Sequence, residues 1–208
     1  MKRSMKRERK IIVYIATSAD GYIARRDGNV DWLNRPRTAG DYGIGAFYRS
    51  IDTILWGRKT YDVALGFQKK KVRGSGFDAK IKNYVFSRKP QRGPTPGVEF
   101  VKLTGPPSRS GFRPVGAFAR RLRATPGKNI WMMGGAELIA SFLDAGEVDE
   151  FIIHVIPTFI GEGIPLVQPN RRDVALSLKS VKRFKDGVVR LHYAVVRPAS
   201  RRRKQARK

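Results

Sequence analysis

The sequence predicts an α/β fold with a mainly parallel central sheet, helices on both faces and an antiparallel hairpin at the C-terminal end. Two observations indicate this fold. Short apolar, β-branched runs alternate with helical segments between residues 11 and 160. Two alternating segments, 174–184 and 187–196, then meet around the tight-turn dipeptide Asp186-Gly187. Because such sheets bind ligands at the carboxyl ends of their strands, the expected site lies at that edge.

The individual elements follow from local residue patterns. Strands are expected where apolar residues run without a helical period, at residues 11–19, 53–56, 83–87, 98–103, 129–133 and 149–160, the last interrupted by Pro157. Helices are expected at 41–50, weakened by Gly43 and Gly45, at 58–66, ended by Gly66, at 115–124 and at 136–146. The stretches 20–32 and 104–114 are rich in turn residues and are interpreted as loops.

Composition limits the class of protein and the chemistry. A chain of 208 residues with 41% hydrophobic residues suits one domain with a full core. The absence of cysteine excludes disulfides and thiolate metal sites, and a metal centre is not expected from only two histidines, His154 and His192. No apolar run approaches the roughly 18 residues of a membrane span, and no secretory signal is present, so we expect a cytoplasmic protein without a membrane partner.

Charge is unevenly distributed along the chain, whose net charge is +26. Residues 1–10 carry six basic and one acidic residue, residues 197–208 carry seven basic and none acidic, and both are expected to be disordered tails around a single domain at 11–196. The tails could bind nucleic acid or another polyanion nonspecifically, although neither has an aromatic residue to stack on bases. The remaining +14 on the body would also steer phosphorylated ligands.

The stretch WMMGGAELI places two glycines, Gly134 and Gly135, between a predicted strand and a predicted helix. Because glycine has no Cβ, a backbone or a ligand can approach closely, and the amides that follow point out of a helix N-terminus. The pattern is typical of a phosphate site. A strand-to-helix turn that needs a positive φ explains it equally well.

The stretch GRKTYD repeats this arrangement at residues 57–62. Gly57 permits a tight turn, and Arg58, Lys59 and Thr60 then occupy the first helical turn, where cations are unfavourable unless an anion is bound. Two such junctions in one small sheet favour a dinucleotide, which has a pyrophosphate and often a further ribose phosphate. Neither matches a phosphate loop or a Rossmann fingerprint, which argues against ATP hydrolysis and the Rossmann fold.

A series of motifs resembles the dihydrofolate reductase-like superfamily. They are DGYIA (20–24), DYGIGAFYRSIDTILWGRKTYD (41–62), YVFSRKP (84–90), GKNIWMMGGAELIASFLDAGEVDEF (127–151) and PTFIGEGIPL (157–166). The resemblance covers about residues 11–196 and is strongest to the C-terminal reductase domain of the bifunctional riboflavin-pathway deaminase-reductase. It implies a dihydrofolate reductase-like fold and an NADPH cofactor.

The resemblance also implies the cofactor residues. One group would hold the phosphates, a second would lie near the adenosine ribose and its 2′-phosphate, a third would approach the cofactor and present helix amides to the pyrophosphate, and a fourth would border the nicotinamide. In that order the groups are Gly57, Arg58 and Thr60; Ser87 and Arg88; Gly134 and Gly135, often joined by a cis peptide, with Ala136, Glu137 and Leu138; and Ala16 with Ile23. An arginine beside a ribose 2′-phosphate favours NADPH over NADH.

The predicted substrate residues are Asp41, His154, Asp20 and Trp32. Asp41 matches by spacing the carboxylate that anchors the pterin in folate enzymes, and it is equally suited to cap a helix. His154 lies in an apolar strand and is predicted to face the substrate as a catalytic residue, the alternative being a satisfied core histidine. Asp20 is an alternative acid or a turn residue. Trp32 could close over the nicotinamide or could simply pack in the protein interior. The first loop, which contains Trp32, is expected to act as a mobile lid.

The sequence therefore predicts an NADPH-dependent reductase of a small heterocyclic substrate, most similar to 5-amino-6-(5-phosphoribosylamino)uracil reductase. One alternative is a dihydrofolate reductase acting on pterins or folates. Another is a basic nucleic-acid-associated protein that reuses the fold without catalysis. A chain without cysteine cannot carry the zinc signature of the deaminase, so that activity would belong to another polypeptide. Related reductase domains are often dimers, which makes a homodimer one expectation.

Overall fold

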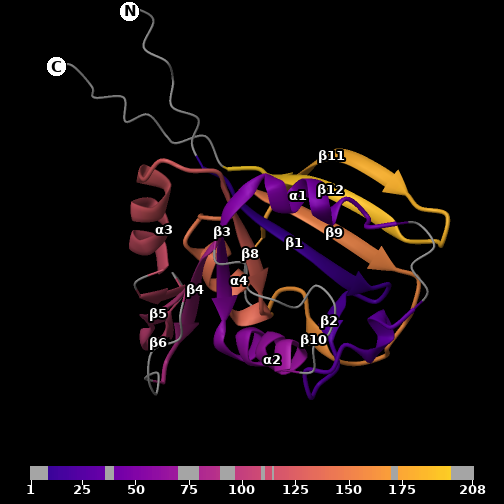
Figure 1. The fold of residues 1–208 in the computed structure, drawn as a ribbon, viewed down its shortest axis with the longest axis horizontal. Coiled ribbons are helices and arrows are strands. Elements are labelled where there is room, and N and C mark those ends of the chain that lie inside the picture. The colour runs from indigo at the N-terminus through magenta and orange to yellow at the C-terminus, as the bar shows by residue number, and fades with distance from the viewer. Residues whose placement is uncertain are drawn as a thin grey trace, which may run out of the picture.

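The computed structural model describes residues 9–35, 40–69, 80–89, 97–108, 111–113, 115–169 and 173–197. Their framework is one eight-stranded sheet with the order β11-β12-β9-β1-β8-β3-β4-β5 (Figure 1). The strands of this sheet are β1 (Ile11–Ser18), β3 (Ile51–Gly57), β4 (Lys82–Ser87), β5 (Val98–Lys102), β8 (Asn129–Gly134), β9 (Glu150–Ile156), β11 (Leu176–Arg183) and β12 (Val189–Val195).

Six neighbouring strands, from β9 to β5, pair in parallel, and the terminal hairpin adds β12 and then β11 by antiparallel pairing. The mainly parallel α/β sheet with an antiparallel C-terminal hairpin, predicted from the sequence, is confirmed. Two further two-stranded sheets join β2 (Tyr22–Ala24) to β10 (Ile164–Pro165) and β6 (Thr104–Ser108) to β7 (Gly111–Arg113).

Helices cover both faces of the large sheet, because the alternating side chains of its strands form two apolar layers. Phe47 of α1 (Ile44–Arg49) and Tyr61 of α2 (Arg58–Lys69) pack on the layer that contains Ile12 and Tyr14. The helices α3 (Val115–Ala124) and α4 (Ala136–Asp144) pack on the layer formed by Ile11, Val13 and their neighbours. No helix in the described part of the chain has the length and apolar character needed to cross a membrane.

Four local expectations were wrong. Segment 104–114 contains β6 and β7 rather than loop alone, because its two halves pair with each other. Gly66 does not end its helix, which continues to Lys69. The strand expected at 149–160 ends at Ile156, directly before Pro157, since proline cannot donate to the sheet. The stretch 20–32 also contains the short strand β2 and a 3₁₀ helix at Asp31–Leu33.

Both ends of the described chain meet at the amino edge of the parallel strands (Figure 1). The Asp149 carboxylate accepts a hydrogen bond of 2.7 Å from the Ile11 amide and forms ion pairs with Arg123 at 2.7 Å and Arg197 at 2.6 Å. The predicted division into a domain at 11–196 and two tails stays a prediction. Residues 1–8 and 198–208 lie outside the described residues.

Candidate functional site

The two glycine-preceded helix starts lie against each other at the carboxyl edge of the sheet. Their strands, β3 and β8, are parallel neighbours. A Cβ added to Gly57 would lie 3.0 Å from the Gly135 amide nitrogen, and one added to Gly135 would lie 3.1 Å from the Thr60 hydroxyl. Gly134 has φ +112°, and the Gly134-Gly135 peptide is cis. The glycines therefore provide both the close approach and the positive φ that the sequence left as alternatives.

The first turn of α4 leaves two backbone amides for a bound anion, rather than the three expected from residues 136–138. Gly135 is the N-cap residue and contributes no side-chain cap. The Leu138 amide, predicted to face the cofactor, instead donates to the Gly135 carbonyl at 3.0 Å. The amides of Ala136 and Glu137 remain at the N-terminus, where a helix has no internal acceptor for them. An anion bound here would thus meet two N–H groups and the positive end of the helix dipole.

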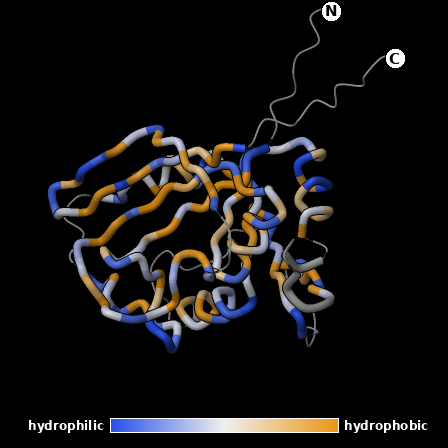
Figure 2. Tube along the Cα trace, turned by 180° about the vertical axis from the view of Figure 1, so that it is seen from behind, coloured by the Kyte–Doolittle hydropathy of each residue, from blue (hydrophilic) through white to orange (hydrophobic). Residues whose placement is uncertain are grey.

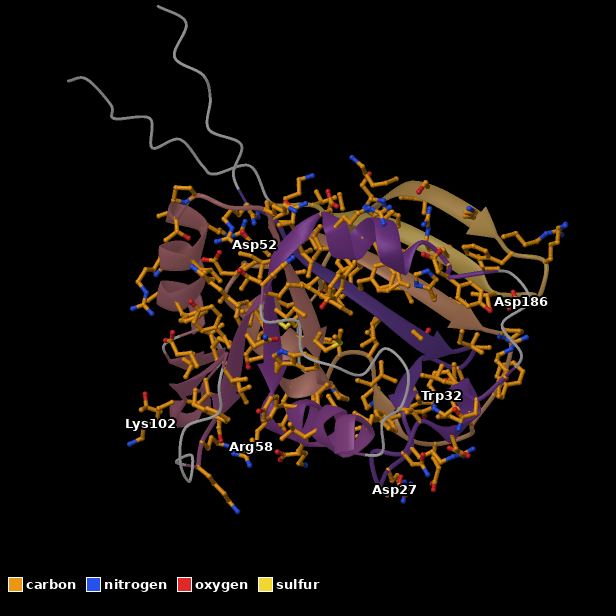
Figure 3. All side chains as sticks on the ribbon, viewed as in Figure 1. Asp27, Trp32, Asp52, Arg58, Lys102 and Asp186 are labelled. Carbon is orange, nitrogen blue, oxygen red and sulfur yellow. The ribbon has the colours of Figure 1, made fainter. Side chains whose placement is uncertain are left out.

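Basic side chains follow the ends of β3, β4 and β5. Arg58 is half-buried, pairs with Asp62 at 2.9 Å and stacks over the Phe100 ring at 5.6 Å. Arg88 pairs with Glu137 of α4 at 3.6 Å. Figure 3 shows Arg58 and Lys102 at the same end of the sheet, opposite the end that carries Asp52. These ion pairs are exposed and therefore weak, so an incoming phosphate can compete for the arginines.

The Ser87 hydroxyl is already used within its own turn. It donates to the Lys89 carbonyl at 2.9 Å and accepts from the Lys89 amide at 3.2 Å, and the residue is buried. Parallel pairing places Ser87 opposite Lys102 of β5. Ser87 thus shapes the turn that carries Arg88, while a lysine that the sequence analysis did not select lies beside it.

Asp20 fastens the beginning of the first loop to the segment after β9. Its carboxylate accepts from the amides of Ile160 at 3.1 Å and Gly161 at 2.8 Å. A hydrogen bond from Ser18, together with these amides, lowers the pKa of Asp20 below its ordinary value. An ionised carboxylate with these partners suits a structural acceptor rather than the alternative substrate-side acid.

Trp32 and Ala16 meet at one apolar cluster. Trp32 is buried with Ile156, Phe184 and Val188, and Ala16 of β1 packs against this group. The Trp32 indole nitrogen is enclosed and has no acceptor among the described residues. Trp32 is therefore packed in this structure, and a contact with the nicotinamide stays a prediction. Ile23, predicted to border the nicotinamide, lies in β2 and is half-buried.

Asp41 caps the start of α1. Its two carboxylate oxygens accept from the amides of Gly43 at 2.8 Å and Gly45 at 3.0 Å. These bonds lower the pKa of Asp41, whose side chain is exposed. The capping role, one of the two readings from sequence, is therefore present, and a contact with substrate stays a prediction.

His154 is buried under the segment that leads into α1. Its Nε2 lies 3.3 Å from the Tyr42 carbonyl oxygen and 3.4 Å from the Tyr14 hydroxyl. Since a carbonyl only accepts, Nε2 carries the proton and donates to Tyr42, as the Tyr14 hydroxyl also does at 3.4 Å. Burial lowers the pKa of His154 and raises the pKa of Tyr14 to about 12. Both groups are neutral at pH 7, and His154 has the partners of a satisfied core histidine.

The hairpin contributes a cation that the sequence analysis did not select. Arg190 of β12 is the register partner of His154. One of its guanidinium nitrogens would lie 2.9 Å from a Cβ on Gly43. Its charge partly offsets the burial that raises the pKa of Tyr14, and it adds to the burial that lowers the pKa of His154. The pairing of distant strands creates this neighbourhood, so no local pattern identifies Arg190.

A family model described as the RibD C-terminal domain matches residues 116–190, which include β8, the paired glycines and α4. The Bacillus subtilis protein YwjB is 40% identical over 187 residues, covering 89% of this chain and 98% of that protein. Bacillus subtilis YyaP is 31% identical, covering 90% of this chain and 95% of that protein. The chain belongs to the RibD C-terminal domain family.

Solved structures show the same fold. A Shewanella sp. PV-4 protein, provisionally named a riboflavin biosynthesis protein, has 25% identity and a TM-score of 0.73, covering 90% of this chain and 99% of that one. A Thermotoga maritima diaminohydroxyphosphoribosylaminopyrimidine deaminase/5-amino-6-(5-phosphoribosylamino)uracil reductase has 15% identity and a TM-score of 0.63, covering 92% of this chain and 58% of that one. Enterococcus faecalis dihydrofolate reductase, with 14% identity, a TM-score of 0.55 and coverage of 89% and 96%, shares the fold.

Proposed function

We propose that this protein is an NADPH-dependent reductase of a small heterocyclic substrate, of the 5-amino-6-(5-phosphoribosylamino)uracil reductase type. Membership of the RibD C-terminal domain family supports a riboflavin-pathway reductase. The observation that carries the cofactor proposal is the contact between the two helix starts, where Gly57 and Gly135 leave room that any Cβ would fill.

The residues at the carboxyl edge fit a dinucleotide phosphate. The Ala136 and Glu137 amides would hold the pyrophosphate, assisted by the Thr60 hydroxyl. Arg58 and Arg88 would hold the 2′-phosphate, with Lys102 as a third cation at the end of β5. When bound, NADPH supplies the hydride. The protein contributes position, charge and the exclusion of water.

The substrate would lie beside β1, next to the nicotinamide end. Ala16 reaches this position on β1, and the Tyr14–His154–Arg190 group lies on the same face under the start of α1. Arg190 provides a cation for an anionic or carbonyl group of the substrate. Asp41, held ionised by two amides, is suited to accept a hydrogen bond from the heterocycle rather than to donate a proton.

The proposal is tested by titrating wild type with NADPH and NADH while following tryptophan fluorescence. We expect NADPH to bind more tightly than NADH, because only NADPH has the 2′-phosphate. Replacing one charge-assisted contact, in Arg58→Ala or Arg88→Ala, should weaken NADPH binding by about tenfold or more, since such bonds contribute about 1.5–3 kcal/mol. NADH binding should change little in either variant.

Arg120→Ala is the matched control, because Arg120 is an exposed arginine on α3 that pairs with Glu147 near the chain ends. It should leave both nucleotide affinities unchanged. Turnover is then measured with the ribosylaminopyrimidine and with dihydrofolate, to separate the two reductase types. If folded wild type binds neither NADPH nor NADH, the proposed reductase function is wrong.

A further inference from the structure

Tyr42, in the turn that leads into α1, has an unusual backbone conformation. Its φ is +53°, and it is the only non-glycine residue in the described part of the chain with a positive φ. A bulky L-residue is disfavoured there, because its Cβ lies too close to the following carbonyl oxygen. Gly40 and Gly43, in the same turn, have φ values of +81° and +91°. A third glycine would suit the backbone best, so the presence of tyrosine indicates a role for its side chain.

The side chain of Tyr42 joins the turn before α1 to the turn of the C-terminal hairpin. Its hydroxyl donates a hydrogen bond to the carboxylate of Asp186, which lies at the turn end of the hairpin (Figure 3). This bond is the main reason that the pKa of Asp186 lies below its ordinary value. The Tyr42 ring also packs edge-on against the Phe184 ring, with 5.1 Å between the centroids. Phe184 and Val188 are buried, and the turn between them is mainly hydrophilic (Figure 2).

The backbone of Tyr42 is fastened separately, to the strands β1 and β9. Its carbonyl oxygen accepts hydrogen bonds from His154 Nε2 at 3.3 Å and from the Tyr14 hydroxyl at 3.4 Å. Burial keeps both donors neutral, since it lowers the pKa of His154 and raises the pKa of Tyr14 to about 12. The hairpin turn and the buried strands thus hold Tyr42 at two points. Surroundings of this kind can maintain a strained backbone, and such strain is common at functional sites.

Asp41 directly precedes Tyr42, and its carboxylate depends on the conformation of Tyr42. The amides that this carboxylate accepts belong to Gly43 and Gly45, on the other side of Tyr42 in the chain. The chain must therefore turn back at Tyr42 for the carboxylate to reach them. A change in the φ of Tyr42 would move the Asp41 carboxylate away from both amides.

The Asp41 carboxylate lies on the side of the sheet where the substrate is proposed to bind. Its charge contributes to the raised pKa of Tyr14, so the two side chains are neighbours. Alternation along β1 places Ala16, predicted to border the nicotinamide, on the same face as Tyr14. The position of this carboxylate is therefore important for recognition of the substrate.

We propose that Tyr42 is a positioning residue for the reductase. By fastening the turn before α1 to the hairpin turn, it holds the Asp41 carboxylate in place for the substrate. The inference rests on the proposed function, in which Asp41 accepts a hydrogen bond from the heterocycle. Tyr42 acts through Asp41 and exchanges no proton with the substrate. The hairpin turn, 144 residues away in the chain, thereby contributes to substrate recognition.

The first test follows hydrogen exchange of the Gly43 and Gly45 amides by NMR, because these amides report whether the Asp41 carboxylate is held. Tyr42→Phe keeps the ring and loses the hydrogen bond to Asp186. Both amides should then exchange about tenfold faster than in wild type, because a hydrogen bond to a charged group no longer holds the turn closed. Thermal melting confirms that each variant is folded.

Two further variants make the exchange test specific. In Tyr42→Gly both amides should exchange at least as fast as in Tyr42→Phe, although glycine suits the backbone better. Protection equal to wild type in Tyr42→Gly would overturn the proposal, because the side chain would then be unnecessary. Tyr193→Phe is the matched control, since Tyr193 belongs to the same hairpin but packs against the layer that contains α4. It should leave the exchange of both amides unchanged.

The second test is a double-mutant cycle of Tyr42→Phe and Asp41→Ala, measured as kcat/KM. Alone, Tyr42→Phe should raise KM for the heterocyclic substrate and lower kcat/KM by about tenfold, with NADPH affinity unchanged. In the Asp41→Ala background the same replacement should have little further effect, because the carboxylate through which it acts is gone. Losses that multiply would overturn the proposal, since they indicate that Tyr42 acts independently of Asp41.

The two tests separate this inference from the proposed function. If wild type binds neither nucleotide and reduces no heterocycle, the proposed function is wrong and the role of Tyr42 is wrong with it. If wild type is active but the Gly43 and Gly45 amides exchange equally in wild type and in Tyr42→Phe, the reductase remains and only the role of Tyr42 is wrong.

Discussion

His154 illustrates how burial selects the state of one residue. Its ring lies 4.8 Å from the Tyr14 ring and 6.3 Å from the Phe184 ring, and its Nε2–H has the Tyr42 carbonyl as acceptor. Removal from water disfavours the charged imidazolium, which lowers the pKa of His154 below its ordinary value of 6.5. The position of a histidine in an apolar strand predicts that its side chain has a polar partner. The sequence alone does not show that this partner is the Tyr42 carbonyl, 112 residues away.

The lowered pKa of His154 makes stability depend on pH. Below about pH 6.5 the unfolded chain takes up a proton that the folded protein does not, so the free energy of unfolding should fall as pH decreases from 7 to 5. The carboxylates with lowered pKa, such as Asp20 and Glu150, lose their contribution only at lower pH. The Tm should therefore drop between pH 7.5 and 5.5 in wild type and drop less in His154→Gln. An identical drop in both proteins would contradict a buried, neutral His154.

At the scale of elements, Asp41 decides where α1 begins. The six-residue helix follows Gly43, which has φ +91° and supplies no cap of its own. Asp41 accepts the Gly43 and Gly45 amides and thereby satisfies donors that the helix leaves unpaired. The same carboxylate occupies the position expected to contact substrate, so the two roles need separate variants.

The variants Asp41→Asn and Asp41→Ala separate the capping role of Asp41 from a role in substrate binding. Asparagine retains only one of the two accepting oxygens and therefore one of the two hydrogen bonds, so its Tm should lie between those of wild type and Asp41→Ala. Alanine removes the cap, and its Tm should be measurably lower. If Asp41 only caps, kcat/KM of the Asn variant equals that of wild type. A loss of kcat/KM in Asp41→Asn as large as that in Asp41→Ala, despite the smaller change in Tm, would show that the charge itself acts on the substrate.

Most elements of the sheet could be predicted because their signals are local. The strands that end at Gly57 and Gly134, and the helices that follow them, are marked by apolar runs and glycine. The pairing of β6 with β7 and the continuation of α2 past Gly66 were missed, because sequence neighbours do not reveal pairing or packing that offsets a weak propensity. The contact between Tyr42 and Asp186 is of the same kind, since it exists only once the hairpin has paired with β9.

At the scale of the whole molecule, opposite edges of the sheet carry different features. The glycine-preceded helix starts lie at the carboxyl edge, whereas Arg9 and Arg197, the two ends of the described chain, lie near the amino edge (Figure 1). Arg120, Arg123 and Arg197 line a hollow of about 480 Å³ there. Nonspecific binding of a polyanion at the chain ends should therefore be independent of nucleotide binding.

Removing residues 1–8 and 198–208 tests this separation. These segments carry net charges of +3 and +6, and the truncation retains the anchored Arg9 and Arg197. Binding of a labelled oligonucleotide should weaken, and the slope of log K against log salt should become shallower, because fewer counterions are released. NADPH affinity should be unchanged. Loss of nucleotide binding together with oligonucleotide binding would contradict independent sites.

The sequence by itself determined the fold class, the two glycine-preceded helix starts and the basic character of the protein, because local backbone freedom, hydrophobic period and charge are properties of short segments. Only the tertiary structure decided that Gly57 and Gly135 touch, that Arg190 lies beside His154, and that Tyr42 reaches the hairpin turn. Each of these depends on which strands pair and in what register. Strand pairing is set by burial over the whole sheet rather than by any one segment.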